Sequence, residues 1–150
     1  MAVLEIEKAI YWLLTSGPDS AALVALRGTR VRPGQGQQED ARPYQVYART
    51  DGGDEGHFTG ANKTEPSVVV VESYAGTLGV LNQVMSATRT ALHCKGSSGG
   101  SPLTVTVGGD SVAIYEMAIT ESETDREAPK DGQGGGVHVG RQAVEIWHQV

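Results

Sequence analysis

Four histidines are the residues of this chain best suited to metal binding or acid–base chemistry. They are His57, His93, His138 and His148. None of them pairs with another histidine, a cysteine or a carboxylate at the spacing of metal ligands. We expect surface histidines and no metal site; a metal site assembled across loops is the alternative.

The single cysteine, Cys94, excludes an internal disulfide and a cysteine-based zinc cluster. It lies at helical spacing with Val84 and Ala91, at the carboxyl end of an expected helix. A nucleophilic cysteine needs a nearby base or a helix amino terminus, whereas the dipole at a carboxyl terminus disfavours a thiolate. We therefore interpret Cys94 as a partly buried structural residue.

Alternating carboxylates occupy positions 121 to 127, and a glycine-rich tract follows at 132–136. The carboxylates do not form an EF-hand pattern, and they indicate a solvated edge or a strand that orders on assembly. The glycine tract lacks the Walker pattern, and a strand follows it where a dinucleotide-binding loop would open a helix. No G-x-S-x-G motif is present. The sequence predicts no catalytic residue, no cofactor and no enzyme activity.

The composition sets limits on the class of protein. The chain has 150 residues, 39% hydrophobic and 20% charged, which is typical of one globular domain. A net charge of −6 argues against a general nucleic-acid-binding surface, which needs basic patches. Charged Glu5, Glu7 and Lys8 inside the first apolar stretch argue against a signal peptide. No apolar run approaches the roughly 20 residues of a membrane span, so the default expectation is a cytoplasmic protein.

Hydrophobic periodicity predicts the elements that would position these residues. Helices are expected at 3–15, 19–26 and 77–95, and strands at 29–32, 43–50, 65–74, 103–107, 111–120 and 137–150. Strands separated by turns, with few helices, indicate an α+β domain. We expect an antiparallel sheet with helices packed on one face, in the order α-α-β-β-β-α-β-β-β. The chain is interpreted as one domain, 1–150, with long loops near 51–64, 96–102 and 121–136.

Four consecutive valines, Val68 to Val71, predict a strand with apolar side chains on both faces. A helix can cover one face, and the other needs a second layer or another subunit. Val69 and Val71 are therefore candidate interface residues. His57 and Phe58 join them, because the loop at 51–64 is a segment that could order against a neighbouring subunit.

The two tryptophans are the other interface candidates. Trp12 shares a helix face with Glu5 and Lys8, away from the apolar stripe, so it is either an incidental surface residue or an interface anchor. Trp147, in the last strand, is expected in the core or in packing between subunits.

The last strand changes the parity of its apolar residues. Val137 and Val139 occupy odd positions, whereas Val144 and Ile146 occupy even ones. A β-bulge near Gly140 would account for the change.

Four segments in this order resemble the tail-completion, or tail-terminator, proteins of long-tailed phages. They are Leu26–Val31 (LRGTRV), Arg42–Tyr47 (RPYQVY), Val68–Tyr74 (VVVVESY) and Ala143–Trp147 (AVEIW). The resemblance covers nearly the whole chain. The insert at 100–110 and the tract at 132–136 are longer than the usual form of the family.

The resemblance implies a small α+β subunit that forms a ring, typically a hexamer, at the end of the tail tube. Such a ring stops tube growth, joins the tail to the head-closure proteins of the neck and lets DNA pass through its lumen. The implied partners are other copies of the chain, the tail-tube protein and head-closure proteins. The implied location is the virion, after assembly in the host cytoplasm. A head-closure or adaptor subunit of the neck is the nearest alternative, and a small ligand-binding module is a more distant one.

Overall fold

The computed structural model of the chain describes residues 3–34, 42–50, 64–92, 103–127 and 137–149. The order of helices and strands agrees with the predicted order, whereas their bounds agree only in part. The elements are α1 (Ile6–Thr15), α2 (Ala21–Arg27), β1 (Val31–Pro33), β2 (Tyr44–Arg49), β3 (Thr64–Ala75), α3 (Leu78–Ala91), β4 (Leu103–Val107), β5 (Asp110–Glu127) and β6 (Val137–Gln149). The predicted loops at 51–64 and 96–102 lie outside the described residues, except that Thr64 begins β3.

Strand β5 differs most from the prediction. It continues to Glu127, through a charged segment that the sequence placed in the loop at 121–136. This segment pairs with β6 from Glu121, opposite Ala143, onward. Acidic residues have low strand propensity. The segment is nevertheless a strand, because its backbone is hydrogen-bonded to β6 and alternate side chains point outward.

The six strands form one mixed sheet in the order β1-β2-β3-β6-β5-β4. Four neighbouring pairs are antiparallel, and the predicted pairing of β2 with the valine strand β3 is confirmed. Strands β1 and β2, however, are parallel: the Gln45 amide donates to the Arg30 carbonyl and the Gly34 amide to the Tyr47 carbonyl. The prediction of a wholly antiparallel sheet is wrong at this edge, because side-chain alternation is the same in either strand direction.

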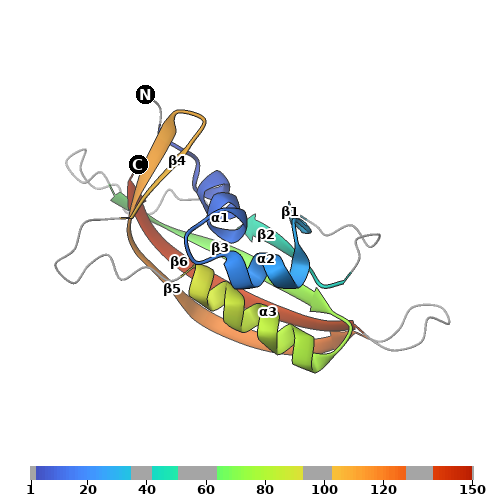
Figure 1. Ribbon diagram of the computed structural model, residues 1–150. Coiled ribbons are helices and arrows are strands. Elements are labelled where there is room, and N and C mark those ends of the chain that lie inside the picture. Colours follow the sequence, from blue (N-terminus) through green and yellow to red (C-terminus); the bar gives the residue numbers. More distant parts are fainter. Residues whose placement is uncertain (1–2, 35–41, 51–63, 93–102, 128–136, 150) are drawn as a thin grey trace.

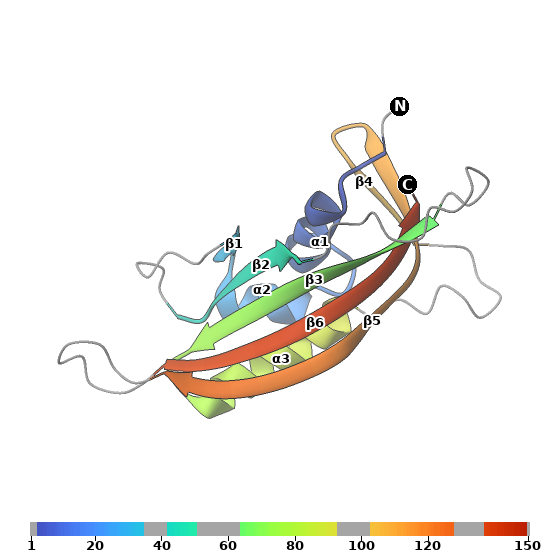
Figure 2. The ribbon, with the colours of Figure 1, turned by 180° about the vertical axis from the view of Figure 1, so that it is seen from behind.

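All three helices lie on one face of the sheet, as predicted (Figure 1). Seen from behind, the opposite face of β3, β6 and β5 carries no helix from the described part of the chain (Figure 2). Helix α3 begins at the N-cap Thr77, whose hydroxyl accepts a hydrogen bond from the Val80 amide at 3.2 Å. Within the described residues, no helix is long and apolar enough to span a membrane.

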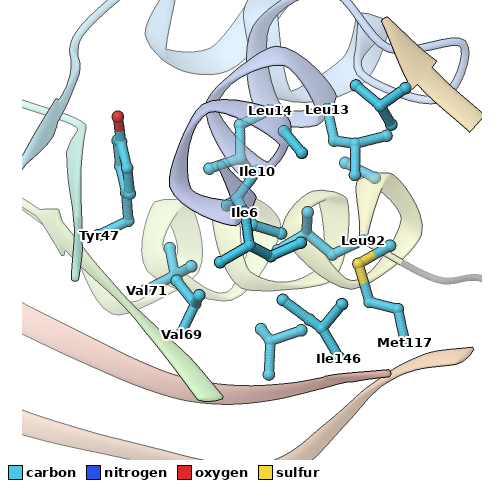
Figure 3. Packing of buried hydrophobic residues seen from close by; sticks show 14 of the residues in the cluster. Ile6, Ile10, Leu13, Leu14, Tyr47, Val69, Val71, Leu92, Met117 and Ile146 are labelled. Carbon is cyan, nitrogen blue, oxygen red and sulfur yellow. The ribbon is translucent and has the colours of Figure 1, made fainter. Parts of the chain in front are cut away.

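The hydrophobic core fills the space between the helices and the sheet (Figure 3). Helix α1 contributes Ile10 and Leu14, which have no exposed surface, and the sheet contributes Val69, Val71 and Ile146, which also have none. Burying one such side chain stabilises the fold by about 1.5–3 kcal/mol. The helix-covered face therefore supplies most of the apolar stabilisation.

The predicted bulge near Gly140 is absent from β6, which pairs with β3 without interruption from Thr64 to Ala75. The irregularities lie in β5, between Ile114 and Glu116 and between Ile119 and Glu121. The change of parity in β6 has another cause. Val137 and Val139 lie on the face away from the helices, whereas Val144 and Ile146 face the helices. A side chain at Gly140 would collide with Met85 of α3, so the glycine allows the helix to approach the sheet.

Candidate assembly surface

The only buried histidine in the described part of the chain is His148, which is 5% exposed. Its Nε2 lies 2.7 Å from the Ser67 hydroxyl, and its Nδ1 lies 2.8 Å from the Gln149 carbonyl oxygen. The prediction of a surface residue is wrong for His148, because even positions of β6 face the helices. The pair resembles a serine–histidine dyad, but Ser67 has no exposed surface, so a substrate cannot reach the hydroxyl. We assign the pair a structural role.

The other residues considered for metal binding or nucleophilic chemistry form no site within the described residues. His138 is half-buried near the start of β6, and His57, His93 and Cys94 lie outside the described residues. No group of three histidine, cysteine or carboxylate side chains within the described ranges could hold a metal ion.

A buried arginine, Arg27, forms the centre of a polar network beneath the helices. Its Nε donates to the Gln45 Oε1 (2.6 Å), and its terminal nitrogens donate to the carbonyls of Leu14 (2.6 Å) and Gly28 (2.5 Å). Burial lowers the pKa of Arg27 to about 10, with a smaller lowering from the charge of Arg30 and an opposing effect of Tyr11. The guanidinium remains charged at neutral pH, so the three acceptors offset the loss of its hydration.

Gln45 extends this network across the core. Its Nε2 donates to the hydroxyls of Ser73 (3.0 Å) and Thr88 (2.7 Å), and the Thr88 hydroxyl donates to the Val84 carbonyl. The network therefore joins α1, α2 and α3 to β2 and β3. It fixes how the helices sit on the sheet, and it was not predicted from the sequence.

The face of the sheet that carries no described helix, here called the open face, is the first candidate contact surface. It presents Val68 and Val70 of β3, both only partly buried, whereas Val69 and Val71 point into the core (Figure 3). Val69 and Val71, the predicted interface residues, are therefore core residues, and Val68 and Val70 are the valines that this face presents. The prediction that both faces of this strand are covered is not met within the described chain.

A hollow of about 680 Å³ lies on the open face. It is lined by Val68, Val70 and Ala143, by the charged Glu121, Glu123 and Arg141, and by Thr50, Thr120 and Ser122. A smaller hollow of about 270 Å³ adjoins it, and both include Glu123 and Arg141. The combination of an apolar centre and charged surroundings is typical of a protein–protein contact surface.

The open face is acidic. Among the described side chains, the strand registers place six carboxylates on it, against the guanidinium groups of Arg32 and Arg141. The carboxylates are Glu72, Glu116, Glu121, Glu123, Asp125 and Glu145. A surface with this excess of negative charge repels the phosphates of nucleic acid.

Trp147 lies on the open face, near the end of β6, and is 39% exposed. Its indole Nε1 donates to the Glu145 carboxylate at 3.0 Å, which holds the ring in place. Of the two alternatives for this residue, core and inter-subunit packing, the exposure favours the second. A pre-positioned, amphipathic tryptophan is a common anchor of interfaces.

Trp12 is not the freely exposed residue that helical spacing suggested. Its ring is partly buried and packs against the core cluster. Its role as an anchor stays a proposal. His57 and Phe58, the remaining interface candidates, lie outside the described residues.

A second hollow surface lies on the helix side, between α2 and α3, with a volume of about 670 Å³. All the side chains that line it are uncharged: Ala22, Ala25, Leu26, Asn82, Gln83, Ser86, Ala87 and Thr90. Because the helices and the open face are on opposite sides of the sheet, the molecule has two unlike surfaces that face in different directions.

The fold, but no sequence family, has a known counterpart. No family model and no curated protein matches the chain. Among solved structures, a chain of the virion of a native gene transfer agent particle has the same fold, with a TM-score of 0.63 and 15% sequence identity. The match covers 97% of this chain and 95% of that one, so it concerns the whole architecture.

Proposed function

We propose that this chain is a structural subunit of a phage-like virion, and that its copies form a ring that caps the tail tube and joins it to the neck. The similarity in fold to a chain of a gene transfer agent virion carries the proposal, because it spans nearly the whole of both chains. The proposed partners are further copies of the chain, a tail-tube protein and head-closure proteins, and DNA passes through the lumen.

Two unlike surfaces on opposite sides of the subunit support a ring. A closed ring is built from a heterologous contact, in which one surface of each subunit meets a different surface of the next. We place the open face, with Val70 and Trp147, against the uncharged groove between α2 and α3 of the neighbouring copy. The partly buried Val70 and the groove residue Leu26 would then lie at the centre of the same contact.

Complementation between two variants tests this arrangement. We expect Val70→Lys and Leu26→Lys each to abolish ring formation, because each buries a charge in one half of the contact. Each variant keeps the half that the other lacks. A mixture of the two should therefore give heterodimers and no larger ring in sedimentation velocity, whereas Ser16→Lys, at an exposed site near the end of α1, should leave rings intact. Normal rings formed by Val70→Lys or by Leu26→Lys alone would refute the proposed contact.

The acidic open face suggests how the ring interacts with DNA. If part of this face borders the lumen, its carboxylates keep the channel from gripping the DNA backbone. Replacing carboxylates of this face that lie outside the contact at Val70, such as Asp125, with lysine should then slow DNA exit from assembled particles. Unchanged ejection kinetics would count against a luminal position of these residues.

A head-closure or adaptor subunit of the neck is the second candidate, since the similarity to a virion chain favours it equally. Cryo-electron microscopy of assembled particles distinguishes the two by the position of the subunit relative to the tube. A small-ligand-binding module would instead purify as a stable monomer with a bound small molecule.

A further inference from the structure

The edge strand β4 lacks the features that normally prevent a sheet edge from pairing. The opposite edge of the sheet, β1, is three residues long and ends at Pro33, which has no amide hydrogen to donate. Strand β4, in contrast, has the uncharged, β-branched sequence LTVTV over Leu103–Val107. Within the described residues its outer edge pairs with no other strand. Such an edge readily accepts a further strand.

The turn that follows β4 determines which backbone groups face outward. Gly108 and Gly109 have positive φ values of 60° and 91°, as a type I′ two-residue hairpin requires. The flanking pair, Val107 and Asp110, is then the hydrogen-bonded pair, and bonding alternates along the hairpin. The amides and carbonyls of Thr104 and Thr106 therefore point away from β5. The Thr106 and Ser111 hydroxyls, 2.7 Å apart, fit the close approach of a non-hydrogen-bonded pair.

The hairpin is held rigidly by the core. Val105 of β4 and Val112 of β5 have no exposed surface and belong to the same cluster as α1. Leu103 and Val107, on the same face of β4, are only partly buried. Because the edge is already ordered, an added strand does not have to fix its conformation, which favours association.

We propose that β4 pairs antiparallel with β4 of a second copy of this chain, about a two-fold axis at Val105. In this register Thr104 lies opposite Thr106 of the second copy, and each of these pairs can exchange two backbone hydrogen bonds. The partly buried Leu103 then lies beside Val107 of the second copy, which removes further apolar surface from water. The contact is independent of the heterologous ring contact, since it uses neither the open face nor the groove between α2 and α3.

Proline substitution tests the backbone contact without disturbing the hairpin. Proline at 106 has no amide hydrogen, so it removes a donor that points away from β5 and leaves the bonds between β4 and β5 intact. Because the dimer is two-fold symmetric, this donor is lost from both copies. We expect Thr106→Pro to weaken dimerisation by about tenfold or more in sedimentation velocity, whereas Thr106→Val should dimerise like the wild type. Thr104→Pro is the second variant, and circular dichroism checks that each one folds. A wild type that stays monomeric up to about 1 mM, or a folded Thr106→Pro that dimerises normally, overturns the proposal.

Crosslinking tests the register. In a Cys94→Ser background, Thr104→Cys and Thr106→Cys each place one exposed thiol on β4. In the proposed register position 104 faces 106 of the other copy, whereas like positions are separated by more than the roughly 7 Å that a disulfide spans between Cα atoms. Oxidation should therefore give disulfide dimers when the two variants are mixed, and few when either is alone. Equal crosslinking of the single variants, or none in the mixture, would exclude this register.

Discussion

Replacing Gln45 tests the buried polar network most directly. The Gln45 side chain accepts a hydrogen bond from Arg27 and donates to Ser73 and Thr88, so one substitution affects three buried partners. Gln45→Leu removes all three bonds and leaves the buried guanidinium with one acceptor fewer. Gln45→Glu is the matched control, because it keeps the size of the side chain and still accepts from Arg27.

The expected magnitude follows from these bonds. A hydrogen bond to a charged group contributes about 1.5–3 kcal/mol and each neutral one about 1 kcal/mol. We therefore expect Gln45→Leu to lower the free energy of unfolding by about 3–5 kcal/mol, a large part of the roughly 5–15 kcal/mol of a typical domain. For Gln45→Glu we expect a loss of about 1–2 kcal/mol. The carboxylate stabilises the guanidinium, but the Thr88 hydroxyl has one hydrogen and can donate either to the carboxylate or to the Val84 carbonyl.

Urea unfolding of the two variants and the wild type measures this difference. The denaturant dependence should be unchanged, so that a shift in midpoint reports stability alone. On heating, the leucine variant should unfold about 10 °C below the wild type. The reasoning is refuted if Gln45→Leu stays within about 1 kcal/mol of the wild type, or if Gln45→Glu is the less stable variant.

Three further outcomes are expected. Burial, which is the main cause, raises the pKa of Tyr47 above its ordinary value of 10.0, so the unfolded chain loses this proton first. Stability should then fall as the pH rises from about 10 to the folded pKa, and Tyr47→Phe should show a shallower fall in urea titrations; parallel curves would contradict this. Gly140→Ala should cost about 1–3 kcal/mol through collision with Met85, and Met85→Ala in the same chain should reduce that cost. Trp12→Ala should reduce ring formation and lengthen tails; normal capping at unchanged monomer stability would show that Trp12 is not an anchor.

The order of elements was predictable because its signals are local. The segment RPYQVY has the alternation of a strand, and the structure confirms that it pairs with the valine strand. Turn residues and helical spacing marked the remaining elements well enough to give their order. The predicted bounds of an element were wrong where pairing with a distant segment sets them. The acidic half of β5 is an example, because pairing with β6 keeps it extended.

The polar residues of the core could not be predicted in the same way. The binary pattern of β2 assigns Gln45 to a polar position, yet its partners on α2, β3 and α3 make that position a buried one. Arg27 at the end of a short helix likewise reads as a surface charge. Only contacts between distant segments supply the acceptors that allow these groups to be buried.

The sequence by itself determined the α+β class, the succession of helices and strands and the acidic charge of the chain, because periodicity and composition act residue by residue. The tertiary structure alone decided which valines are core and which are surface. Alternation divides Val68 to Val71 into two sets without saying which set the helices cover. It also decided the parallel pairing of β1 and the position of β4 at the edge of the described sheet, since strand direction and strand neighbours are set by the whole sheet.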